Sequence, residues 1–139
     1  MKKTFVLSTV VCFFLISSMF SQEKDGSGFM VKMDKAPLVF SVSKDKSDEI
    51  WKRINFFITE YSMTKIQVAT EFIIETNNPG TMGEFAYSAS RTTKGDSVEF
   101  KVKCIGPSGS EKLADRNAHV LAYYAATGES IPSNAVIRR

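Results

Sequence analysis

The chain has few of the residues from which catalytic and metal sites are usually built. It contains one histidine, His119, and two cysteines, Cys12 and Cys104. A single histidine among scattered carboxylates gives no zinc or copper signature. The sequence also lacks a G-x-S-x-G motif, a Walker phosphate loop, an H-E-x-x-H helix and a C-x-x-C pair. We therefore expect no metal ion and no cofactor, and no motif indicates an enzyme class.

The N-terminus has the pattern of a secretory signal. Two lysines follow Met1 and precede an uncharged run from Thr4 to Phe20, and serines gather at the end of this run. This order predicts a signal peptide over residues 1–21, cut after Ser21. An apolar run of about 17 residues is short for a hydrocarbon core of ~30 Å, which favours cleavage over retention as a membrane anchor. The very short charged start indicates a bacterial source.

Cleavage after residue 21 changes both the charge and the cysteine content. The 18 basic residues fall to 16, against 15 acidic residues, so the mature protein is close to neutral. A neutral surface lacks the broad positive footprint that nucleic-acid binding requires, and it gives no strong case for anionic membranes. Cys12 leaves with the signal, and Cys104 then has no disulfide partner in the chain. We expect a periplasmic or secreted protein that depends on its own hydrophobic core.

Composition divides the mature chain into three parts. Residues 22–35 are polar and contain glycine, which predicts a flexible lead-in. Residues 36–128 carry the periodic patterns of a single folded domain. Residues 129–139, which include Pro132 and end in two arginines, predict an extended or mobile tail.

The first half of the domain predicts a strand, a helix and two further strands. Alternation about Phe40 indicates a half-buried strand, and Lys44 to Met63 forms a helix that Asp45 is expected to cap. One face of this helix carries Ile50, Trp51, Ile54, Phe57, Ile58 and Tyr61. Residues 65–76 are rich in β-formers, and two strands are favoured over one bulged strand. Pro79 and Gly80 predict a type II turn.

The second half predicts a hairpin followed by a helix. Residues 85–92 and 97–105 alternate in hydrophobicity around a short turn at Gly95. A helix follows from Ser110, its expected cap, to Thr127, and Gly128 ends it. The order β-α-β-β-β-β-α predicts a two-layer α+β sandwich, with an antiparallel sheet of four to five strands and two helices on one of its faces.

His119 is the first residue to consider for catalysis, because an imidazole transfers protons near neutral pH. On the helical wheel it faces outward, with Asp115 and Tyr123 four residues away on either side. A solvated histidine beside a carboxylate accounts for this pattern more simply than a catalytic group. His119 and Tyr123 therefore stay candidate site residues, either for binding or for a small hydrolase or lyase.

Asn117 falls in the middle of the apolar stripe of the same helix. A buried amide without partners would cost roughly 1 to 3 kcal/mol, so hydrogen bonds to it are expected. Either it bonds backbone and fixes the helix in place, which is the simpler interpretation, or it orients a ligand in a pocket.

Three further features invite a functional interpretation. Phe56 and Met63 project outward from the first predicted helix, which sometimes marks a partner surface. Lys101 and Lys103, with Arg91, are expected on the solvated face of the hairpin, interrupted by Glu99. An ordinary solvated sheet face is the simpler interpretation, and contact with an anionic envelope component is the functional one. The alternation at Cys104 predicts a buried and unreactive thiol.

A weak family resemblance rests on four short segments. These are Asp48-Glu49-Ile50-Trp51, Lys65-Ile66-Gln67, the run from Arg116 to Tyr124, and Thr127-Gly128-Glu129. They resemble small exported bacterial proteins of unknown function that have a TBP-like, two-layer α+β domain. The likeness spans about 90 residues in element order. It implies the fold and an exported bacterial setting, and it carries over no activity or catalytic residue.

The sequence therefore favours an exported, non-catalytic binding or interaction module of the cell envelope, with a protein or a small envelope molecule as ligand. Its binding surface would be the sheet face, the surface of the last helix, or the side that carries Phe56. Two alternatives stay open. One is a small hydrolase or lyase that uses His119, and the other is a structural assembly subunit.

Overall fold

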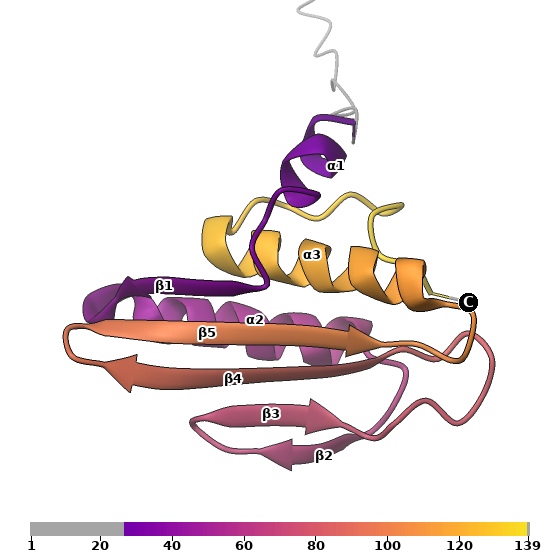
Figure 1. Cartoon of the computed structure of the whole chain (residues 1–139), viewed down its shortest axis with the longest axis horizontal. Helices are drawn as coiled ribbons and strands as arrows, with labels where there is room; N and C mark the ends of the chain where they lie inside the picture. Colours follow the sequence, from indigo (N-terminus) through magenta and orange to yellow (C-terminus); the bar gives the residue numbers. More distant parts are fainter. Residues whose placement is uncertain (1–26, 139) are drawn as a thin grey trace, which may run out of the picture.

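The computed structural model describes residues 27–138, which form one α+β unit (Figure 1). The elements in chain order are α1 (Ser27–Met33), β1 (Val39–Ser43), α2 (Ser47–Tyr61), β2 (Ile66–Ala69), β3 (Ile73–Thr76), β4 (Ala86–Lys94), β5 (Ser97–Ile105) and α3 (Glu111–Thr127). The predicted signal peptide, residues 1–21, lies outside the described residues. Within residues 27–138, no helix is long and apolar enough to cross a membrane.

The five strands form one antiparallel sheet in the order β1-β5-β4-β3-β2. Its centre is the long β4–β5 hairpin, which is paired from Ala86 opposite Ile105 to Lys94 opposite Ser97. Gly95 turns this hairpin with a φ of +60°, a conformation that glycine adopts without a steric penalty. The hairpin, the five strands and the two strands within residues 65–76 are as the sequence predicts.

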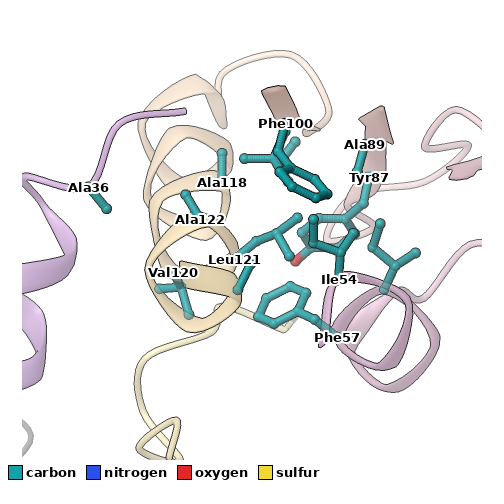
Figure 2. Packing of buried hydrophobic residues seen from close by; sticks show 14 of the residues in the cluster. Ala36, Ile54, Phe57, Tyr87, Ala89, Phe100, Ala118, Val120, Leu121 and Ala122 are labelled. Carbon is teal, nitrogen blue, oxygen red and sulfur yellow. The ribbon is translucent and has the colours of Figure 1, made fainter. Parts of the chain in front are cut away.

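The core lies between one face of the sheet and the pair α2 and α3. Helix α2 buries the predicted stripe, in which Ile54, Phe57 and Ile58 have no exposed surface. Figure 2 shows Phe57, Tyr87, Phe100 and Leu121 converging between the two helices and the strands. Phe57 meets the ring of Tyr87 edge-on at a centroid distance of 5.6 Å, an arrangement that aromatic pairs favour.

Two local predictions are wrong, because the backbone at each position has a different conformation from the one expected. Asp45 does not cap α2; residues Lys44–Lys46 form a 3₁₀ turn, and the Ser47 hydroxyl donates to the Lys44 carbonyl at 2.7 Å. Gly80 does not have the positive φ that a type II turn needs. Instead, the Glu84 carboxylate accepts the Gly80 N–H at 2.7 Å, and this bond lowers the pKa of Glu84.

The lead-in predicted to be flexible contains a third helix. Helix α1 packs on α3, on the side of α3 that faces away from the sheet (Figure 1). Phe29 and Met33 are buried, and the Phe29 ring meets Tyr123 edge-on at 5.0 Å. The polar, glycine-bearing start of this segment concealed the pair Phe29 and Met33, which are four residues apart and therefore share a helix face.

The C-terminal tail is also packed rather than mobile over residues 129–138. It runs back along α3, and Ala135 and Val136 belong to the hydrophobic core. Arg116 of α3 donates to the carbonyls of Asn134 and Ala135, at 2.7 and 3.2 Å. Tail residues therefore cover part of the outer side of the α2–α3 layer. The predicted sandwich of two helices on a sheet did not include this packing.

The packing of α1 can be tested with Phe29→Ala. Loss of a buried ring that contacts Tyr123 should lower the free energy of unfolding by about 3 kcal/mol, measured by urea denaturation. Val31→Ala is the matched control, because Val31 lies on the same helix and its side chain is 61% exposed. Equal unfolding midpoints for the two variants would contradict the packed position of α1.

Candidate functional site

The face of the sheet opposite α2 and α3 is covered by no helix of the described chain. Alternation along the strands places small residues of β4 in the middle of this open face, and longer side chains on its neighbours. Ser90 lies between Lys101 of β5 and Ile73 of β3. Ser88, two residues earlier, lies between Lys103 and Glu75 in the same way.

The size difference between these side chains produces a trough along β4. Two adjoining hollows, of about 290 and 280 Å³, share Glu75, Ser88 and Lys103 in their linings. Gln67 and Asn78 extend the first hollow, and Ile73 and Lys101 extend the second. The trough therefore has a floor of small residues, one wall that carries two lysines and another that carries a glutamate.

The charged groups of the trough are free to meet a ligand. Lys101, Lys103 and Glu75 take part in none of the ion pairs among residues 27–138. Glu99, which interrupts the lysines in sequence, is neutralised by Lys94 at 2.7 Å. The sequence predicts Lys101, Lys103 and Arg91 on one face of the hairpin, and the structure places Lys101 and Lys103 there.

Arg91 lies on the opposite face, so its predicted place beside the lysines is wrong. Its guanidinium lies over the Trp51 ring, 5.3 Å from the ring centroid, and binds Asp48 at 2.7 Å. Arg91 therefore packs the sheet against the start of α2.

Asn117 has the hydrogen-bond partners that its burial requires. Its side chain has no exposed surface. Its amide nitrogen donates to the Ile137 carbonyl at 3.1 Å, and its amide oxygen accepts the Ile137 N–H at 2.9 Å. Asn117 thus bonds one residue of the tail as a neighbouring β-strand would. This geometry matches the backbone-bonding interpretation.

His119 and Tyr123 are partly covered instead of fully outward-facing. His119 Nδ1 lies 2.8 Å from the Ala36 carbonyl, and Nε2 lies 3.6 Å from the Asp115 carboxylate. The Tyr123 hydroxyl donates to Glu129 at 2.6 Å, and this carboxylate raises the pKa of Tyr123. The predicted outward position changes because α1 and the connection to β1 lie over this side of α3, which the sequence gave no reason to expect.

Phe56 projects outward as predicted, and so does Met63. The two side chains are 56% and 53% exposed, and Phe56 also lies near Tyr124 at a ring distance of 6.3 Å. Phe56 is on α2, whereas Asn117, His119 and Tyr123 are on α3, and none of these four lines the trough. The predicted site residues are therefore not brought into one site.

Sequence reasoning did not assign Glu75 or Ser88 to a surface of the sheet. Each is an ordinary polar position in an alternating strand, and only the β3–β4 register places them opposite each other and beside Lys103. The alternation in both strands, considered together, would have assigned Glu75 and Ser88 to one face of the sheet. It would not have shown which residues of the adjacent strands lie beside them.

Cys104 and Tyr87 form a buried polar pair beside Asn117. Burial raises the pKa of the Cys104 thiol from 9.0 to about 12, and it raises the pKa of Tyr87 above its usual range. Cys104 is thus buried as the sequence predicts. The Tyr87 hydroxyl lies near both neighbours, but no contact in residues 27–138 meets the geometry of a hydrogen bond. High pKa values make both groups poor nucleophiles at neutral pH.

Within the described part of the chain, no group of three or more histidine, cysteine or carboxylate side chains is placed to hold a metal ion. Comparison with protein-family models, with curated proteins and with solved structures gave no match. Function therefore has to be argued from the geometry of this chain.

Asn117→Leu tests the structural role of the buried amide. The variant leaves the N–H and C=O of Ile137 without partners, so we expect it to lower the free energy of unfolding by about 2 to 4 kcal/mol. The control is Asn77→Leu, at an exposed loop position. A thermal midpoint unchanged from that of the parent chain would show that the amide does not stabilise the fold.

The raised pKa of Cys104 predicts a loss of stability in alkali. Above pH 9.0 the unfolded state loses the thiol proton, whereas the folded state keeps it up to about pH 12. The contribution of Cys104 to the free energy of unfolding is therefore fully present below pH 9.0 and is lost as the pH rises towards about 12. In Cys104→Ala, the free energy of unfolding should fall less steeply over this range, by on the order of a few kcal/mol in total. Tyr87 titrates in the same direction, so some decline should remain. Identical pH slopes in urea denaturation would contradict the prediction.

Proposed function

We propose that the protein is an exported, non-catalytic binding module of the bacterial cell envelope, and that the trough on the open sheet face is its ligand-binding surface. The observation that carries this proposal is the set of three charges, Lys101, Lys103 and Glu75, that form no ion pair within residues 27–138 and lie around a floor of small residues. Charged side chains in a folded protein often pair with one another, and these three instead surround a hollow that can hold a ligand.

The rest of the molecule supports this choice of surface. On the helical side, Asn117, His119 and Tyr123 are engaged with backbone or with a carboxylate of the same chain. A ligand on that side would have to break these contacts, whereas a ligand in the trough would break none. The export signal in the sequence accounts for the cellular setting of the proposal.

No specific observation favours the alternatives over a binding module. A hydrolase or lyase that uses His119 needs a substrate site next to the imidazole, but Nδ1 already contacts the Ala36 carbonyl. An assembly subunit needs a large apolar contact surface, and the two exposed apolar side chains of Phe56 and Met63 make a small one.

The proposal is tested by site-specific photo-cross-linking in the native cells. A photoreactive phenylalanine analogue at Ser90, in the trough, should capture a ligand or partner, and the same analogue at Lys52, on exposed α2, should not. Capture from Lys52 alone would contradict the assignment of the surface.

Charge reversal supplies the second arm of the test. The double variant Lys101→Glu and Lys103→Glu should reduce capture at Ser90 about tenfold or more, because charge-assisted hydrogen bonds contribute roughly 1.5 to 3 kcal/mol each. Lys52→Glu with Lys112→Glu makes the same change of net charge at exposed helical positions and should leave capture intact. An equal loss in both double variants would indicate a general charge effect and overturn the proposal.

A further inference from the structure

The edge of the sheet next to β1 contains a gap in the hydrogen-bond ladder. Strand β1 pairs with β5 from Ser43 opposite Ser97 to Val39 opposite Lys101, and the Val102 N–H still donates to the Leu38 carbonyl at 2.9 Å. In an antiparallel ladder the N–H and C=O of one residue point to the same neighbour, and every second residue points the same way. The N–H and C=O of Cys104 therefore point to the β1 side.

The residue that would pair with Cys104 is turned away. Continuation of the register places Ala36 opposite Cys104. The Ala36 N–H donates to the Met33 carbonyl at 2.9 Å, and its carbonyl lies 2.8 Å from His119 Nδ1. Figure 2 shows Ala36 on the far side of α3 from Tyr87 and Phe100. Because both of its backbone groups are used elsewhere, no residue among 27–138 pairs with the C-terminal end of β5 on this side, and this end of the strand has a free edge.

A cavity of about 380 Å³ lies at this free edge, and Cys104 is among its lining residues. Its apolar wall consists of Leu38, Ala114 and Ala118, and the carboxylates of Glu111 and Asp115 lie at its helical side. Lys103 and Ile105 also line the cavity, but alternation directs both side chains to the open face of the sheet. The space thus combines unpaired main chain, an apolar wall and two acids of α3.

We propose that this edge binds an extended peptide segment of a partner protein, which adds to β5 as a strand and carries a basic side chain towards Glu111 and Asp115. Main-chain hydrogen bonds to Cys104 would supply the part of the affinity that does not depend on the peptide sequence. The cavity would select an apolar side chain next to a lysine or arginine. This is β-strand addition at a site separate from the trough. It stands whether or not the trough binds a ligand.

The free edge and the acidic side are independent observations that require the same occupant. A small apolar molecule would fill the cavity but leave the main-chain groups of Cys104 without partners, at a cost in free energy. A nucleic acid would meet two carboxylates, which repel phosphates. An extended basic peptide can form hydrogen bonds with the Cys104 main chain, pack an apolar side chain against the cavity wall and pair a cation with the two carboxylates.

The test uses the peptide acetyl-Val-Lys-Val-Lys-Val-amide with the full chain, followed by backbone NMR. We expect saturable shifts at residues 103–106 and 111–115, and exchange of the Cys104 amide hydrogen slowed about tenfold or more at saturation, since each hydrogen bond to a partner strand protects its amide. Shifts confined to β1 or to β2, the two edge strands of the sheet, would overturn the proposal. Absence of binding would overturn it as well.

Two control peptides separate strand addition from simple charge attraction. A version with N-methyl groups on alternate backbone nitrogens keeps every side chain but cannot donate main-chain hydrogen bonds, so it should lose binding. The peptide acetyl-Val-Glu-Val-Glu-Val-amide should bind at least about tenfold more weakly because it meets the acids of α3. These comparisons use the unaltered chain. Equal binding of the N-methylated peptide would contradict strand addition whatever the behaviour of any variant.

Protein variants then locate the acidic contact. Glu111→Gln with Asp115→Asn should weaken binding of the lysine peptide about tenfold. The chemical shift of the Cys104 amide in the free variant should stay unchanged, which shows that β5 keeps its position. Glu71→Gln with Asp96→Asn is the matched control, because it removes two acids at exposed positions outside the cavity. Equal weakening in both double variants would show that only net charge matters and overturn the assigned contact.

Discussion

Helix α3 buries side chains on two sides, and the arrangement of the other elements follows from this constraint. Its inner side, with Ala118 and Leu121, meets the sheet and α2, and these residues have almost no exposed surface. Asn117 is equally buried, and its amide is satisfied only because the Ile137 backbone lies against it. A polar group inside an apolar stripe therefore requires the tail to be in place. The tail is consequently part of the folded domain.

The same constraint explains why the helical side offers few free functional groups. His119 holds the Ala36 carbonyl, Arg116 holds the tail, and Tyr123 contacts both α1 and Glu129. Each of these side chains attaches one of the two ends of the chain to α3. Side chains on the open face of the sheet do not attach either end of the chain. On this face, Lys103 and Glu75 have no ion-pair partners among the described residues. The proposed trough and the side chains that hold the two ends of the chain on α3 thus lie on opposite faces of one sheet.

Patterns within a single element were enough to predict the strands, the α2 stripe, the hairpin and the burial of Cys104. They failed where distant segments meet. The prediction that His119 faces outward used the helical wheel of α3 alone, and α1, eighty residues earlier in the chain, covers that side. Arg91 was assigned to the solvated face by its charge, although alternation in β4 places it with Phe100 on the face that meets Trp51. Glu75 was not assigned to the open face, because its neighbours there depend on the register of three strands.

The early departure of β1 connects the two proposed surfaces. His119 holds the carbonyl of Ala36, so β1 separates from β5 just before Cys104, and the end of β5 has a free edge on one side and the trough on the other. Lys103 and Ile105 line both the edge cavity and the first hollow of the trough. A strand added beside Cys104 would therefore also extend the open face, and would place alternate side chains next to Lys103. Occupation of the edge would change the charge and shape of the trough without any movement of the core, so binding at the two surfaces is expected to be coupled through β5.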